Sequence, residues 1–263
     1  MTPFFKYTVL AAAMIFAATA CRKDRPQRGQ HTPAYLLMRT TEGANKVNRY
    51  EYTQNGQLSK QVYFAGFTTA DSAYMTFSYK DGMPEKMSVG GEETRYFYAN
   101  GRLAKMEVHT VADGMQYYWE YQYESGRLVQ ETGFEKVNGG WKANARRVLT
   151  YDAQGNLAKR EFFSDDNHSG TFHKVHYVEY TGYLDHPDPV EQLAVKRQVP
   201  GTQTAPRLCT KEHWYDGQGF EEWTTEYSYR FNEAGYPVEK AVLSKNPDGH
   251  VINRTTITYA YNR

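Results

Sequence analysis

The stretch Tyr96-Phe97-Tyr98-Ala99-Asn100-Gly101-Arg102-Leu103-Ala104-Lys105-Met106-Glu107 decides the fold. An aromatic segment precedes Asn100-Gly101, and a segment of apolar and charged residues follows it. Asn-Gly is favoured in two-residue β-hairpins because a type I′ turn needs positive φ at both central residues. Similar stretches follow at 121–131 and 151–161, with looser copies around Gly56, Gly82 and Gly235. The repeat therefore predicts a chain built from successive antiparallel hairpins.

The same turn signal recurs along the rest of the chain. Asn-Gly or Asp-Gly occurs at positions 55–56, 81–82, 100–101, 113–114, 138–139, 216–217 and 248–249. Between these turns the residues alternate in character, with Tyr117, Trp119 and Tyr121 on one strand face and Gln116 and Tyr118 on the other. The spacing predicts about 14–18 strands in an all-β antiparallel up-and-down meander, curled or closed into a barrel. No segment has the apolar spacing of a confident helix.

One segment interrupts this rhythm, between Tyr183 and Pro206. His-Pro-Asp-Pro at 186–189 opens it, and Pro200 and Pro206 close it. We expect a long loop, with a short helical turn possible, rather than a domain boundary. Tyrosine-rich alternation resumes at His213, so residues 34–263 are predicted to form a single β-meander domain.

Composition argues against a nucleic-acid partner and indicates a polar, tyrosine-rich sheet. The net charge is +1, from 31 Lys and Arg against 30 Asp and Glu, so no nucleic-acid groove is predicted. The 23 tyrosines suit strands whose rings cover a sheet face while the hydroxyls reach water. A mean hydropathy of −0.77 indicates much polar surface rather than a thick aliphatic core.

The first residues predict export and a lipid anchor. Residues 1–20 have a lysine-containing head and an apolar run too short to span a bilayer, as in a signal peptide. Ala18-Thr19-Ala20-Cys21 resembles a lipobox, which predicts lipidation of Cys21. Cleavage of an ordinary Ala-x-Ala site before Cys21 is the alternative. Residues 21–33 are polar and contain two prolines, which is typical of a flexible tether. The remaining cysteine, Cys209, reads as a small buried hydrophobe.

Two resemblances follow from these motifs. Tyr151-Asp152-Ala153-Gln154-Gly155-Asn156-Leu157 resembles the YD repeat of RHS-type proteins. The lipobox, the tether and the degenerate Tyr-x-Tyr…Gly-Arg-Leu hairpins together resemble uncharacterised Bacteroidetes lipoproteins with a porin-like fold. This resemblance covers about 230 residues. It implies a porin-like barrel on an outer-membrane lipoprotein facing the periplasm or the cell surface, and it brings no catalytic residues.

The barrel is expected to stand in water rather than in a bilayer. Read as plain alternation, Leu103 shares its strand face with Lys105 and Glu107, and Leu157 shares its face with two further charged residues. A charge on the lipid face near the middle of a bilayer costs about 2–4 kcal/mol. We therefore expect a water-soluble barrel, anchored to the membrane only through Cys21.

Neither metal binding nor catalysis is predicted. His173 and His176 would point to opposite faces of a strand, and Cys209 and His213 lie too far apart for one ion. The acidic cluster at 165–168 reads first as a polar turn. No nucleophile motif or phosphate-binding loop is present. We therefore expect no cofactor and no enzymatic activity.

Binding is the leading functional hypothesis. An aromatic stripe could stack on a glycan or peptide, although packing of the barrel interior explains it as well. The candidate ligand-binding residues are Trp119, Tyr121, Trp141, Trp214 and Trp223. The sequence thus predicts a non-enzymatic envelope lipoprotein that binds a glycan, a peptide or a partner protein. A structural repeat shell without a ligand site and an integral outer-membrane pore are the alternatives.

Overall fold

The sheet is described by a computed structural model, which covers residues 35–43, 46–65, 72–190 and 207–262. All its strands belong to one compact unit, Thr32–Arg263. Within the described residues there is no helix, and so none long and apolar enough to cross a membrane. The strands are β1 (Leu37–Glu42), β2 (Lys46–Tyr52), β3 (Leu58–Ala65), β4 (Ser72–Lys80), β5 (Met83–Val89), β6 (Glu92–Ala99), β7 (Arg102–Thr110), β8 (Gly114–Glu124), β9 (Arg127–Val137), β10 (Gly140–Tyr151), β11 (Leu157–Ser164), β12 (His173–Thr181), β13 (Lys211–Asp216), β14 (Glu221–Phe231), β15 (Pro237–Lys245) and β16 (Val251–Tyr261).

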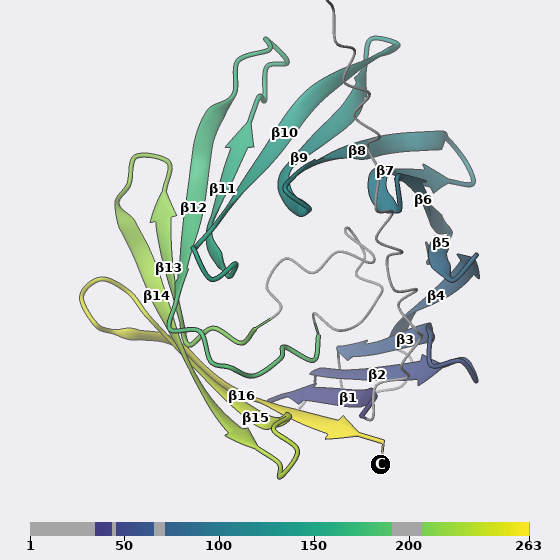
Figure 1. Ribbon diagram of the computed structural model, residues 1–263. Coiled ribbons are helices and arrows are strands. Elements are labelled where there is room, and N and C mark those ends of the chain that lie inside the picture. Colours follow the sequence, from purple (N-terminus) through teal and green to yellow (C-terminus); the bar gives the residue numbers. More distant parts are fainter. Residues whose placement is uncertain (1–34, 44–45, 66–71, 191–206, 263) are drawn as a thin grey trace, which may run out of the picture. The chain divides into compact units, whose positions relative to one another are not determined.

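These strands form one closed barrel of antiparallel neighbours (Figure 1). Each strand pairs with the next one along the chain, and β16 closes the barrel by pairing with β1. Thr40 faces Tyr259 across this closing pair. The prediction of an all-β up-and-down meander that closes is confirmed, and the sixteen strands fall inside the predicted range. Closure removes the open sheet edges that invite aggregation.

Three of the predicted turns have the type I′ backbone, at 81–82, 100–101 and 138–139. At 55–56, 113–114 and 248–249 only the glycine has positive φ, and at 216–217 neither residue has. Asn100 and Gly101 have φ of 52° and 72°, so both central residues of the β6–β7 turn are left-handed. Asn and Gly tolerate positive φ better than other residues, which is why this dipeptide fixes the hairpin locally.

A bulge corrects the predicted faces of the strands that leave these turns. In β7 the register shifts between the pairs Phe97↔Lys105 and Tyr98↔Leu103, because one extra residue is inserted after the turn. Leu103 therefore shares its face with Met106, and Lys105 lies on the opposite face. The register also shifts after Leu157 in β11. The predicted faces are wrong: Leu103 does not share its face with Lys105 and Glu107, nor Leu157 with Lys159 and Glu161, because a one-residue bulge exchanges the faces.

The buried side chains occupy one face of the closed sheet. Leu103, Met106 and Val108 are at most 2% exposed, whereas the intervening Lys105 side chain is 32% exposed. Side chains converge on the concave face of a closed sheet and diverge on the convex face, so we assign the buried face to the interior. The largest apolar cluster on this face consists of Met87, Tyr96, Leu103, Met106, Val108, Tyr121, Leu128, Leu149 and Leu157.

A recurring hydrogen bond locks each hairpin to the preceding turn. We call it the tyrosine clasp: a tyrosine hydroxyl near the end of an even-numbered strand donates to a backbone carbonyl near the start of the strand before it. Tyr151, for example, donates to the Leu128 carbonyl at 2.8 Å. The tyrosines that make this bond are Tyr52, Tyr79, Tyr98, Tyr151, Tyr183, Tyr229 and Tyr261.

The interruption of the rhythm is a long connection between β12 and β13. Its two described ends pair with each other, since Leu184 N donates to the Leu208 carbonyl at 2.9 Å and Leu208 N to the His186 carbonyl at 3.1 Å. Residues 191–206, where a short helical turn was considered, lie outside the described residues. The connection therefore begins and ends as a small hairpin of its own.

Candidate functional site

A row of aromatic side chains runs across the inner wall of the barrel from β8 to β14. Stacked neighbours are Phe162 with His176, at 4.2 Å between ring centroids, His176 with Trp214, at 5.8 Å, and Trp214 with Trp223, at 4.9 Å. We call Trp119, Arg147, Phe162, His176, Trp214 and Trp223 the aromatic ladder. All six are partly exposed.

Arg147 connects Trp119 to the stacked rings of this ladder. Its guanidinium lies 4.4 Å from the Trp119 ring and 6.0 Å from the Phe162 ring, within cation–π range. Arg147 Nη1 donates to Glu131 Oε2 at 2.8 Å, and that carboxylate side chain is only 6% exposed. Because the ion pair is partly buried, it fixes the guanidinium between the two rings.

Trp119 covers a glycine on the neighbouring strand. It faces Gly133 across the β8–β9 pair, and a Cβ at Gly133 would lie 2.9 Å from the indole. That distance is shorter than real Cβ contacts, so a larger residue would displace the ring. Because Gly133 has no side chain, the Trp119 indole can lie flat against β9.

Polar groups accompany the ladder. Trp214 Nε1 donates to Glu212 Oε2 at 3.1 Å, which orients the indole. Burial lowers the pKa of His176, the Glu222 carboxylate opposes this shift, and the Arg147 charge adds to it. His176 is therefore neutral at pH 7 and stacks as an uncharged aromatic ring.

The structure brings most of the predicted binding residues together. Trp119, Trp214 and Trp223 belong to the ladder, and Tyr121 lies two residues from Trp119 on the same face, with 7% exposure. Trp141 is separated from them, because it packs on the outer-face Tyr118 at 5.1 Å between ring centroids. Trp141 is therefore not part of the ladder, and its role in binding stays a prediction.

Sequence reasoning missed three members of the ladder: Arg147, Phe162 and His176. All three side chains lie on the inner face. The bulges in β10 and β11 shift the alternation of the side chains, so the sequence does not show which face they take. Only the cross-strand register shows that they align with the tryptophans.

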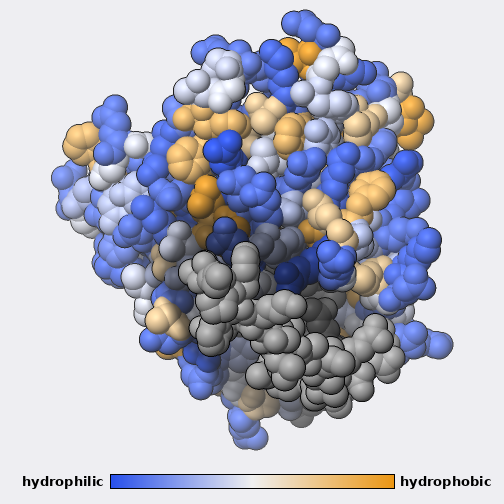
Figure 2. Space-filling model, turned by 45° about the horizontal axis from the view of Figure 1, so that its top comes forward, coloured by the Kyte–Doolittle hydropathy of each residue, from blue (hydrophilic) through white to orange (hydrophobic). Residues whose placement is uncertain are grey.

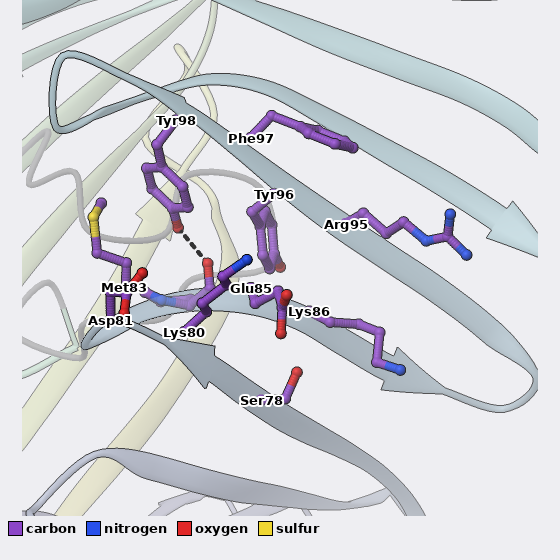
Figure 3. A pocket seen from close by; sticks show the side chains of 11 residues that line it. Ser78, Lys80, Asp81, Met83, Glu85, Lys86, Arg95, Tyr96, Phe97 and Tyr98 are labelled. Atoms are coloured by element: carbon purple, nitrogen blue, oxygen red, sulfur yellow. Dashed lines mark hydrogen bonds between the residues drawn. The ribbon is translucent and has the colours of Figure 1, made fainter.

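Apart from the ladder, a cleft lies in the barrel wall between β4, β5 and β6 (Figure 3). Its volume is about 760 Å³. β5 pairs with β6 only from Lys86 to Val89, so the two strands part towards the turns. Tyr96 and Tyr98 point towards β5, and the Tyr98 hydroxyl donates to the Pro84 carbonyl at 2.7 Å. The cleft thus lies where β5 and β6 separate, and the clasp bond from Tyr98 to Pro84 spans it.

The residues considered for metal binding or catalysis have structural partners. Asp165 is 2% exposed, and its carboxylate accepts hydrogen bonds from Ser169 N at 3.0 Å and Gly170 N at 2.7 Å. These bonds lower the pKa of Asp165 against the opposing effect of burial. Burial raises the pKa of the Cys209 thiol to about 12. Among the described residues, no three His, Cys, Asp or Glu side chains could share an ion.

Comparison with known proteins identifies the fold. No family model and no curated protein matches the chain. A porin-like protein from Bacteroides uniformis ATCC 8492 is 16% identical with a TM-score of 0.62, over 87% of this chain and 98% of that one. A porin-like protein from Bacteroides vulgatus ATCC 8482 is 9% identical with a TM-score of 0.58, over 87% and 99%. At these identities the likeness shows the fold alone: this chain is a porin-like barrel.

Proposed function

We propose that the protein is a non-enzymatic envelope lipoprotein that binds a glycan along the aromatic ladder. The observation that carries the proposal is the row of partly exposed rings on the inner wall, accompanied by Glu131, Arg147 and Glu212. Ligand sites are mostly apolar, with a few placed polar groups. The ladder has this composition, and the apolar faces of sugar rings would pack against its aromatic side chains.

The outer wall supports a barrel that stands in water. Lys105 Nζ lies 2.8 Å from Glu107 Oε1 in the middle of β7, and Lys174 Nζ is ion-paired with Glu161 between β11 and β12. These pairs lie on the convex face, where an integral pore needs an apolar belt. On the face that Figure 2 shows, hydrophobic residues are interspersed with hydrophilic ones. The outer charges therefore favour the soluble barrel over the pore.

The anchor and location of this barrel are proposed from the sequence. The signal peptide at 1–20, Cys21 and the tether at 21–33 lie outside the described residues. Porin-like neighbours from Bacteroides are in keeping with an outer-membrane lipoprotein facing the periplasm or the cell surface. A Cys21→Ser variant should lose lipid labelling and leave the membrane fraction; unchanged labelling would refute the anchor.

Glycan binding is tested with the unit 32–263, which contains both partners of every strand pair. It is prepared without detergent and titrated calorimetrically with a panel of neutral and acidic oligosaccharides. Truncating a central aromatic contact costs about 2 kcal/mol or more, so Trp214→Ala and Trp223→Ala should each weaken binding roughly 30-fold. Trp141→Ala is the matched control, because this tryptophan lies on the outer wall.

The outcomes separate the three hypotheses. Binding that depends on Trp214 and Trp223 but not on Trp141 supports the proposal. Binding of no oligosaccharide by a correctly folded barrel would instead favour the structural shell. A requirement for detergent, with channel conductance in lipid bilayers, would favour the pore.

A further inference from the structure

Arg160 is a cation on the inner wall beside the aromatic ladder. It lies on β11 two residues from Phe162, on the same face and roughly 7 Å away along the strand. Its cross-strand neighbours are Leu149 on β10 and Val178 on β12, and Val178 in turn faces Trp214. Both neighbours are apolar and at most 3% exposed. The guanidinium therefore emerges from an apolar patch between two rings of the ladder.

No anion in the described part of the chain neutralises Arg160. It has neither a hydrogen bond nor an ion pair there, and its Nε is buried without a partner. Two carboxylates of the inner wall have other partners, since Glu131 pairs with Arg147 and Glu212 accepts from Trp214. Burying a charge without a counter-ion is unfavourable. An anionic group placed at Arg160 would remove this cost.

We propose that the ligand of the ladder is an acidic glycan, a uronic-acid oligosaccharide whose carboxylate pairs with Arg160. This inference rests on the proposed function. The planar guanidinium matches a carboxylate with two parallel hydrogen bonds, and the flanking rings take the sugar faces. An acidic peptide is less suited, because extended peptides bind by adding a strand to an open sheet edge. The strands that carry the ladder are paired on both sides.

The test compares charged and neutral ligands on the same protein. The unit 32–263 is titrated with oligomers of galacturonate, mannuronate and glucuronate, with methyl-esterified galacturonate oligomers and with neutral galactose oligomers of matched length. Poly-glutamate of similar charge is the peptide arm. An ionic hydrogen-bonded contact predicts that the uronates bind roughly 10- to 100-fold more tightly than the ester or the neutral oligomer.

Arg160→Met should remove this preference and leave the binding of neutral oligomers unchanged. Arg146→Met is the matched control: the Arg146 Nε also lacks a partner, but its guanidinium lies over Phe172 on the outer wall, 4.1 Å from the ring centroid. The comparison of acid with methyl ester uses the unmodified protein and stays decisive if Arg160→Met fails to fold.

Equal binding of acidic and neutral oligomers would overturn the inference and leave the proposed function standing. Poly-glutamate binding that depends on Arg160 but not on Trp214 would overturn it in favour of a peptide. Binding of none of the oligosaccharides would overturn both proposals.

Discussion

At the scale of the residue, the tyrosine clasp explains why most copies of the repeat have a tyrosine before the glycine turn and a leucine or proline after it. Across one turn the two residues face each other, as Tyr98 faces Leu103. The hydroxyl reaches the carbonyl of the preceding repeat, as Tyr151 reaches Leu128. Each repeat is thus bonded to the one before it. A phenylalanine would fill the same volume but leave that carbonyl without its donor.

Tyr151→Phe should lower the free energy of unfolding by about 1 kcal/mol, because one net intramolecular hydrogen bond is lost. For a domain of this size that shift lowers Tm by about 2–4 °C, measured by differential scanning calorimetry. Tyr74→Phe is the control, since Tyr74 is 58% exposed and its hydroxyl donates no hydrogen bond in the described structure. Equal effects of the two changes would contradict the clasp.

At the scale of the element, a bulge beside the turn decides which wall the charges of the strand face. In β7 it places Leu103 and Met106 inside and Lys105 and Glu107 outside. The predicted barrel was right, but its predicted face assignment was wrong at these strands. Simple alternation fails there because a bulge adds one residue without a partner, and the side-chain period of two then shifts by one.

The face assignment predicts losses of stability of different size for two residues of the same strand. Leu103→Ala should cost about 2–5 kcal/mol of stability, because a fully buried side chain leaves a cavity. Lys105→Ala should cost less than about 1 kcal/mol, since its ion pair with Glu107 is partly solvated. Urea titrations monitored by fluorescence measure both values. A larger loss for Lys105→Ala would reverse the assignment of walls.

At the scale of the whole molecule, the interior holds many buried or half-buried phenols beside its aliphatic core. Burial raises the pKa of each of these hydroxyls well above its usual value near 10. The affected residues are Tyr52, Tyr79, Tyr98, Tyr121, Tyr183, Tyr227, Tyr229, Tyr259 and Tyr261. The phenols therefore remain protonated donors in the folded barrel.

This burial predicts cooperative unfolding at alkaline pH. Above pH 10 the unfolded chain loses phenolic protons that the folded barrel retains, so stability is intact below pH 10 and falls as the pH rises. Each such group contributes up to about 1.4 kcal/mol per pH unit. As the pH is raised above 10, tyrosinate absorbance should increase over the same pH range in which the far-ultraviolet circular dichroism of the sheet is lost. Independent titration of the tyrosines near pH 10, with the fold intact, would contradict this prediction.

The sequence by itself determined the antiparallel hairpins, the positions of their turns and the approximate number of strands. These follow from local chemistry, because Asn-Gly and alternating side chains act over a few residues. Only the tertiary structure decided which wall each side chain faces and that Arg147, Phe162 and His176 join the tryptophans. Those contacts depend on bulges and on pairing between strands, which set the register across the barrel.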